Sequence, residues 1–178
     1  ACGTISSNKI WEADTIKVTC DILVASGATL TIFPGTYVQF QGPYKLEVQG
    51  RLLAVGAADK MITFSIKDTT YFSRMDSFNR GGWKGIQFNS IPVANDSSKL
   101  MYCKISYGKA SSNIWQNQRG GGIYVYNSNK LLISNCYISN NVACYIGSGI
   151  YIESSNPRIL NSVICNNSVL TITGGYPF

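Results

Sequence analysis

The chain has 178 residues, of which 45% are hydrophobic and 13% are charged, and it carries a formal net charge of +6 without any histidine. This length fits one domain, and the composition argues against disorder and suits a packed all-β fold. The missing histidine excludes Ser-His-Asp and Cys-His catalysis. Without histidine or a Cys-x-x-Cys motif, we expect neither a metal site nor a cofactor.

The N-terminal half predicts short strands separated by turns. Residues 1–15 are expected to be a lead-in that caps one end of the fold, with Trp11 as its bulky residue. Alternation of apolar and polar residues predicts the strands that follow, at residues 16–24, 29–32, 37–40, 46–48, 52–55 and 62–65. Glycine and proline between these runs mark the turns.

Two longer segments, residues 66–84 and 106–121, interrupt this rhythm. Long loops on a rigid scaffold often carry binding residues, and aromatic side chains beside arginine suit stacking on sugar rings. The candidate ligand-binding residues are Tyr71, Phe72, Arg74, Arg80, Trp83, Trp115 and Arg119. The alternative is that these aromatic side chains fold back and cover the side of the scaffold.

A repeat occupies residues 120–167. Gly122-Ile123-Tyr124-Val125 returns 27 residues later as Gly149-Ile150-Tyr151-Ile152. Asn140-Asn141 returns 26 residues later as Asn166-Asn167. A period of this size indicates one supersecondary unit stacked on its copies.

The same unit extends towards the N-terminus. Gly85-Ile86-Gln87-Phe88 matches the first phrase of the repeat. Leu100, Cys103 and Ile105 have the same spacing as Ile133, Cys136 and Ile138. The copies have strand periodicity and leave no room for a crossover helix. Each turn of chain must therefore lie on the previous one, with parallel strands about 4.8 Å apart and a right-handed crossover.

The sequence thus predicts one all-β domain over residues 1–178, a single-stranded right-handed parallel β-helix. This solenoid would have roughly seven coils. Matching positions of neighbouring coils are expected to form structural ladders. Cys103 stacks on Cys136 as a pair of buried thiols, and Asn141 stacks on Asn167 at a turn.

The alternative for the cysteines is disulfide bonding between coils. Cys2 with Cys20 would fix the N-terminal segment, and Cys144 with Cys165 would clamp the last coils. Six cysteines allow 15 pairings, so the sequence leaves the choice open.

Three phrases of the chain resemble the repeats of known right-handed parallel β-helix proteins. They are Trp83-Lys84-Gly85-Ile86-Gln87-Phe88, Gly120-Gly121-Gly122-Ile123-Tyr124 and Ile138-Ser139-Asn140-Asn141. The chain is similar to bacterial secreted and surface proteins of this fold, including the polymorphic outer-membrane-protein type with GG-Ile and F-x-x-N repeats; here Ile138 takes the place of the phenylalanine. The resemblance implies a secreted or bacterial cell-surface location. It covers adhesins, polysaccharide lyases and hydrolases, and phage tail parts.

The acidic residues do not form the paired carboxylates that glycan-cleaving enzymes need. The nearest approach is Asp68 with Asp76, in the first inserted segment. We therefore expect no enzyme but a non-catalytic structural or adhesive module that associates with copies of itself through its coil ends, because an uncapped coil exposes strand edges and open head-to-tail contacts build filaments.

The alternative function is binding or cleavage of polysaccharide by the two inserted segments. The positive charge favours an acidic glycan or cell-surface polysaccharide as a partner. The basic residues are scattered, which argues against nucleic acid as a partner. The sequence contains no apolar run of 18 residues, the length that insertion into a membrane would need.

Overall fold

The structure is a computed structural model that describes residues 1–74, 80–112 and 118–170. Its strands lie in three parallel sheets of six strands and one small sheet of three. Sheet A contains β1 (Gly3–Ile5), β4 (Ile22–Val24), β7 (Leu46–Val48), β10 (Ile86–Asn89), β14 (Ile123–Tyr126) and β18 (Ile150–Glu153).

Sheet B contains β2 (Lys9–Trp11), β5 (Thr29–Ile32), β8 (Arg51–Val55), β11 (Ser98–Met101), β15 (Leu131–Ser134) and β19 (Arg158–Leu160). Sheet C contains β3 (Thr15–Val18), β6 (Tyr37–Phe40), β9 (Ile62–Ile66), β12 (Cys103–Ser106), β16 (Tyr137–Ser139) and β20 (Val163–Cys165). The small sheet contains β13 (Lys109–Ala110), β17 (Val142–Ala143) and β21 (Ser168–Val169).

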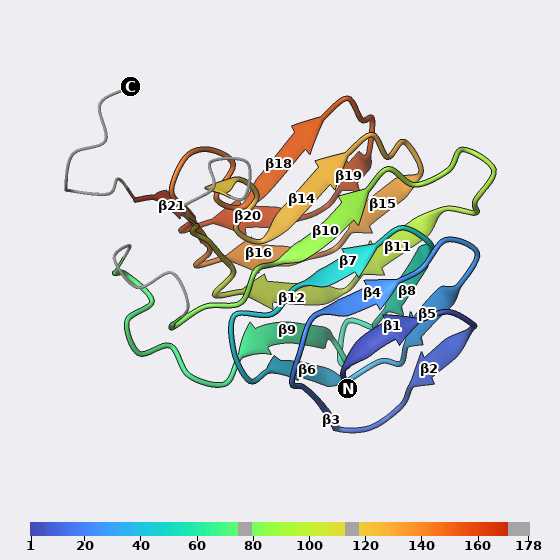
Figure 1. Cartoon of the computed structure of the whole chain (residues 1–178), viewed down its shortest axis with the longest axis horizontal. Coiled ribbons are helices and arrows are strands. Elements are labelled where there is room, and N and C mark those ends of the chain that lie inside the picture. The colour runs from blue at the N-terminus through green and yellow to red at the C-terminus, as the bar shows by residue number, and fades with distance from the viewer. Residues whose placement is uncertain (75–79, 113–117, 171–178) are drawn as a thin grey trace.

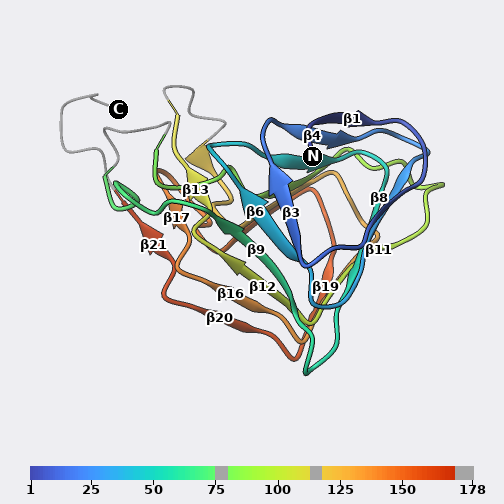
Figure 2. The ribbon, with the colours of Figure 1, turned by 90° about the horizontal axis from the view of Figure 1, so that it is seen from below.

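The chain runs through sheets A, B and C in turn and then begins the next coil, so six coils stack on one another (Figures 1 and 2). The fold is the predicted right-handed parallel β-helix. It has six coils rather than about seven, because the two inserted segments take up residues that the estimate assigned to strands. The view along the stack in Figure 2 shows the three-sided outline of the coils.

The register confirms the repeat. Ile123 pairs with Ile150 on one side and with Ile86 on the other. Ile105 pairs with Ile138 in the next coil. Equivalent residues of successive coils therefore lie directly above one another, as the spacing predicts.

The expected lead-in over residues 1–15 is wrong, because this segment is itself the first coil. It contains β1, β2 and the start of β3. Trp11 lies in β2 of this coil, is 5% exposed, and pairs with Ile32 of the next coil in an inward column. The strand predicted over residues 16–24 is two strands, because the chain turns a corner between β3 and β4.

The interior consists of apolar columns, one for each inward position of the strands. One column in sheet B contains Trp11, Ile32, Ala54, Leu100, Ile133 and Ile159. Corners between sheets use asparagine with positive φ, a conformation that this residue tolerates. Asn140 and Asn166 have φ of 57° and 54° at the same corner of successive coils.

Candidate functional site

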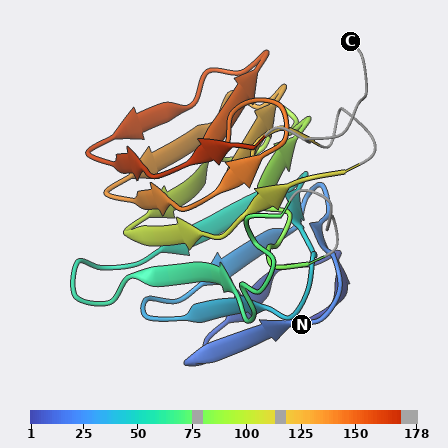
Figure 3. The same cartoon turned by 90° about the vertical axis from the view of Figure 1, so that its left-hand side faces the viewer.

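The described parts of the two inserted segments, residues 66–74 and 80–84 and residues 106–112 and 118–121, lie one above the other at the corner between sheets C and A (Figure 3). Trp83 of the first segment bridges to Gly108 of the second, and their backbones exchange hydrogen bonds. The approach is so close that a Cβ atom at Gly82 of the first segment would lie 2.3 Å from the Cβ atom of Lys109 in the second. The corner is therefore packed rather than open.

Trp83 is a core residue and not a ligand-binding residue. Its side chain is fully buried, and its ring stacks on Phe40 at 4.2 Å between centroids. Its Nε1 donates a hydrogen bond to the carbonyl of Ser106 at 2.8 Å. The alternative that the loop aromatics fold back onto the scaffold holds for this residue. Trp115 lies outside the described residues.

Tyr71, Arg74 and Arg80 do lie together at the surface. Tyr71 is 42% exposed, and the guanidinium carbons of both arginines lie 5.6 Å from the centre of its ring. Phe72 points the other way and contacts the ring of Tyr107 edge-on at 5.2 Å. The predicted set is thus divided between a small exposed cluster and residues that pack against the coils.

Lys109 fixes this segment, and the sequence analysis missed it. The side chain is 2% exposed. Its Nζ donates to the carbonyls of Tyr71, Arg74 and Arg80 at 3.0, 2.6 and 3.0 Å. A single lysine in a polar stretch gives no signal of burial, because its partners are backbone oxygens that any sequence supplies.

Arg119 lies away from the other candidates, beside the outer face of sheet A. Its Nη1 donates to the hydroxyl of Tyr151 at 3.0 Å and forms an ion pair with Glu153 at 3.1 Å. The guanidinium also lies over the rings of Tyr151 and Tyr145, at 5.2 and 5.6 Å. It therefore joins a different surface from that predicted.

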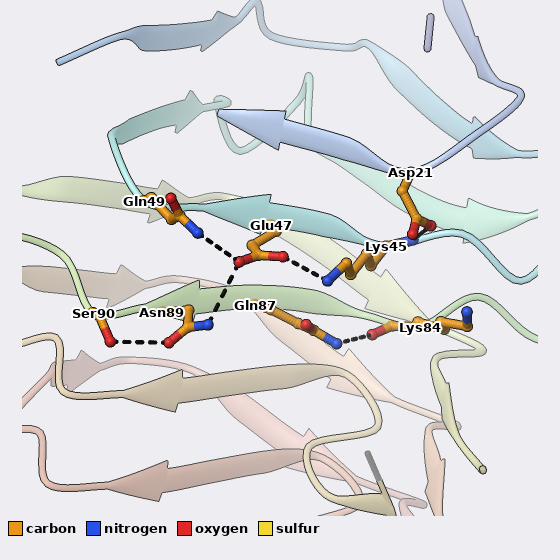
Figure 4. Close-up of polar contacts among 8 residues, drawn as sticks. All are labelled: Asp21, Lys45, Glu47, Gln49, Lys84, Gln87, Asn89 and Ser90. Carbon is orange, nitrogen blue, oxygen red and sulfur yellow. Dashed lines mark hydrogen bonds and ion pairs between the residues drawn. The ribbon is translucent and has the colours of Figure 1, made fainter. Parts of the chain in front are cut away.

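The outward residues of β7, β10, β14 and β18 form a band along sheet A, which we call the sheet A strip. Its half nearer the N-terminus is polar (Figure 4). Glu47 accepts hydrogen bonds from Lys45 and Gln49, the latter at 2.9 Å, and a long one from Asn89 at 3.5 Å. Burial acts to raise the pKa of Glu47, but these donors and the Lys45 charge outweigh it, so the pKa lies below its ordinary value.

The half of the sheet A strip nearer the C-terminus is aromatic. Tyr124 stacks on Tyr151 in the next coil, with 5.5 Å between ring centroids and 16° between planes. Tyr124 also stacks on Tyr126 of its own strand at 6.4 Å. Burial, followed by the charge of Glu153, raises the pKa of Tyr124. The strip thus combines flat rings with amides and paired charges.

Comparison with protein families identifies the fold independently. The family described as "right handed beta helix region" matches residues 78–176, which is more than half of the chain. The chain belongs to the right-handed β-helix family. A search of curated proteins found no match, and a search of solved structures found none either.

The ladders of this β-helix are those predicted. Cys103 and Cys136 are buried free thiols in matching positions, and each Sγ donates to a carbonyl of the preceding coil, that of Ala54 or of Leu100. Burial, followed by the neighbouring Cys136, raises the pKa of Cys103 well above its ordinary value.

The asparagine ladder satisfies backbone groups at a corner of the β-helix. Asn141 is fully buried. Its Oδ1 accepts from Gly108 N at 2.8 Å, and its Nδ2 donates to the Ile105 carbonyl at 3.1 Å. Asn167 repeats this one coil later, since its Oδ1 accepts from the backbone N of Asn141 at 2.9 Å.

One of the two disulfides considered is present. Cys2 and Cys20 are bonded, across a sequence separation of 18 residues. Cys144 and Cys165 are not joined in a disulfide, so the clamp considered as an alternative is absent among the described residues. Cys144 follows β17 in the small sheet, whereas Cys165 pairs below Ser139 in sheet C, and the two thiols therefore belong to different columns.

The last coil exposes residues in core positions. Ile152 and Ile164 continue two inward columns of the β-helix, yet they are 42% and 48% exposed. In the described part of the chain, β18, β19 and β20 each pair with a strand on one side only. This end face is therefore apolar in the middle and has open strand edges around it.

Within residues 1–74, 80–112 and 118–170, no helix has the length and apolar character needed to cross a membrane. No group of three or more His, Cys, Asp or Glu side chains there is arranged to hold a metal ion.

Proposed function

We propose that this β-helix is a non-catalytic structural module that associates with copies of itself through its end coils. The observation that carries the proposal is the exposed end face of the sixth coil. A strand edge with unpaired N–H and C=O groups is a template for another strand, and exposed apolar area next to it favours burial by a partner.

The first coil offers a surface of matching layout. The columns that end at Ile152, Ile159 and Ile164 begin at Ile5, Trp11 and Ile16. Each of these columns therefore has an aliphatic or aromatic residue at both ends; in the first coil Ile5 and Ile16 are partly exposed, and Trp11 is buried. A contact between the first face of one molecule and the last face of another is head-to-tail and does not close, so it builds filaments.

The proposed setting is an extracellular one, secreted or at a bacterial cell surface, where the module would be part of an adhesive rod. The disulfide between Cys2 and Cys20 supports this setting, because such bonds persist in oxidising compartments.

The test is self-association measured by light scattering and electron microscopy over a range of concentrations. Ile164→Lys places a charge on the end face and should leave monomers. Val163→Lys is the matched control: it is on the same strand and 44% exposed, but it points outward from sheet C. Monomers of the unmodified protein at every concentration, or equal effects of the two variants, would contradict the proposal.

A second candidate function, polysaccharide binding, is favoured by the sheet A strip. Tyr124, Tyr126 and Tyr151 form a row of rings beside amide groups, a combination suited to sugar rings and hydroxyls. We propose binding rather than cleavage at this strip. A hydrolase needs two carboxyl groups that flank the bond to be cleaved, whereas Glu47 and Glu153 lie on strands three coils apart and each is held in an ion pair.

A glycan array tests this second function. Tyr126→Ala should reduce binding to any glycan that the protein retains, because Tyr126 is the more exposed end of the ring row. Tyr37→Ala, on the outer face of sheet C, is the control. An array without hits, or binding that Tyr126→Ala leaves unchanged, would refute it.

A further inference from the structure

The outer face of sheet C differs from the sheet A strip in its charge. The outward positions of its six strands carry two lysines, Lys17 and Lys104, and no carboxylate. On sheet A the outward positions include Glu47 and Glu153, each paired with a cation. Sheet C therefore presents positive charge that its own strands do not neutralise.

A hollow of about 510 Å³ crosses this face over the third, fourth and fifth coils. Tyr107 and Tyr137 form aromatic parts of its lining; Lys104 pairs directly with Tyr137 of the next coil, and Tyr107 follows Lys104 in its own coil, directly after β12. Hydroxyl groups of Ser106 and Ser139 complete its polar surface. We call this hollow the sheet C groove.

Lys104 supplies an available charge to the sheet C groove. Its side chain is exposed, and none of the ion pairs found among the described residues includes it. Lys45 and Arg119, by contrast, are both held by glutamates on sheet A. An unpaired ammonium group next to neutral hydroxyls favours a ligand that carries its own negative charge.

Tyr107 is held in place before any ligand arrives. Its backbone N donates to the Asn140 carbonyl at 3.1 Å, and its carbonyl accepts from Trp83 N at 3.3 Å. Phe72 of the first inserted segment contacts its ring edge-on. Tyr137, which lies beside Lys104 in the next coil, is 49% exposed and leaves part of its ring accessible. A fixed wall lowers the entropy cost of binding.

We propose that the sheet C groove binds an anionic oligosaccharide, a chain of uronic-acid or sulfated sugars. A sugar ring stacks on Tyr137, and the acid group of that or the next sugar lies at Lys104. Hydroxyl groups of the serines replace water around the remaining sugar hydroxyls. A nucleic acid fits less well, because a phosphate on every residue needs several cations along its path, and the groove offers one.

This inference does not depend on the end-to-end association or on the sheet A strip. Its variants lie on sheet C and point outward, so they leave the end face unchanged. Self-association can therefore fail while glycan binding succeeds, or the reverse.

The experiment is calorimetric titration with a uronate oligosaccharide, a sulfated oligosaccharide, a neutral glucan and a single-stranded oligonucleotide. One of the two anionic glycans should bind, more tightly than the neutral glucan, and its affinity should fall as salt is raised. Lys104→Gln and Tyr137→Ala should each weaken binding about tenfold, which corresponds to one lost charged or stacking contact.

Two matched controls accompany these variants. Lys99→Gln removes an equal charge from the outer face of sheet B, and Tyr37→Ala removes a ring from an outward position of sheet C that does not line the groove. Both should leave the affinity for the anionic glycan within twofold. Thermal unfolding should show that Lys104→Gln is folded, as expected for an exposed side chain.

The inference is overturned if neither anionic glycan binds, if the neutral glucan binds equally well, or if the oligonucleotide binds more tightly than both glycans. It is also overturned if Lys99→Gln weakens binding as much as Lys104→Gln does, because the effect would then be one of overall charge and not of this groove.

Discussion

At the scale of single residues, Asn141 shows how a buried amide replaces strand pairing at a corner. The Oδ1 of Asn141 accepts a hydrogen bond from the backbone N–H of Gly108, and its Nδ2 donates to the carbonyls of Ile105 and Ser139. Because Asn141 is fully buried, none of these groups can turn to water instead.

Asn141→Ala should therefore lower the free energy of unfolding by about 2–3 kcal/mol, the cost of leaving buried polar groups without partners. Asn167→Ala should cost less, because Asn167 lies in the last coil and is partly exposed. Urea unfolding of both variants measures the difference. Equal losses would mean that the ladder acts through something other than burial.

The position of Trp83 in an inserted segment predicts a role in ligand binding, whereas its burial predicts a role in stability. Its stacking on Phe40 and its complete burial predict that Trp83→Ala lowers the free energy of unfolding by about 3–5 kcal/mol, as for other large core side chains. Tyr71→Ala, at an exposed site of the same segment, should cost less than about 1 kcal/mol. Chemical denaturation of the two variants checks this, and similar losses would place Trp83 outside the core.

Residue types in a periodic pattern were predictable from sequence, and isolated ones were not. Cys103, Cys136, Asn141 and Asn167 lie in ladders because their spacing repeats. Trp83 lies in a repeat phrase, but neither its residue type nor that of Lys109 recurs at the matching positions of the next coil. A tryptophan or lysine in a loop has the same local sequence whether it points inward or outward. Only the packing of the two inserted segments against each other decides their positions.

At the scale of elements, the inserted segment that ends at Trp83 is fastened by one side chain of the next coil. Lys109 lies at β13, beneath the segment, and binds three of its carbonyls. Among its described residues, the backbone hydrogen bonds of the segment's own include Phe72 N to the Thr69 carbonyl and Arg74 N to the Tyr71 carbonyl. Lys109 adds three bonds to carbonyls of this segment, so we expect it to hold these described residues in place.

Lys109→Met keeps the length of the side chain and removes its donors. Residues 69–74 and 80–82 should then exchange their amide hydrogens at least tenfold faster, while β12 and β16 keep their protection. Hydrogen exchange with mass spectrometry measures both regions. Lys104→Met, which changes an exposed lysine five residues earlier, should leave exchange in the segment unchanged. If the segment keeps its protection in Lys109→Met, other contacts hold it.

The elements themselves were largely predictable. Strands at residues 29–32, 37–40 and 46–48 are those expected, because alternation and glycine turns define them locally. The first coil was missed because three-residue strands are too short to show a period, and they are specified by the coil stacked on them. The sites on the outer faces were missed for a related reason: Tyr107 and Tyr137 meet only when coils are placed in register.

At the scale of the whole molecule, each coil contacts only its neighbours, and the two end coils have one neighbour fewer. The Cys2–Cys20 bond closes the first coil on itself. A disulfide across a separation of this size contributes about 3 kcal/mol by limiting the unfolded chain. The disulfide stabilises the first coil, which stacks on one neighbouring coil only, as the end unit of a stacked repeat does.

Reduction of this bond should therefore loosen the first coil before the others. Amide protection should fall over residues 3–18 and remain over residues 123–139, as measured by hydrogen exchange with and without reductant. Cys2→Ser should reproduce the pattern without reductant. A uniform loss of protection over all coils would instead show that the molecule unfolds as one cooperative unit.

The strict register between coils also sets how such a molecule changes its length. Ile123 lies over Ile150, and each inward column repeats from coil to coil. A gene duplication that copies one whole turn, about 27 residues, therefore adds one coil without disturbing the register of the coils on either side. It moves the sheet C groove and the end face apart by about 4.8 Å. The distance between two binding surfaces on such a molecule can therefore change during evolution only in fixed steps of one coil.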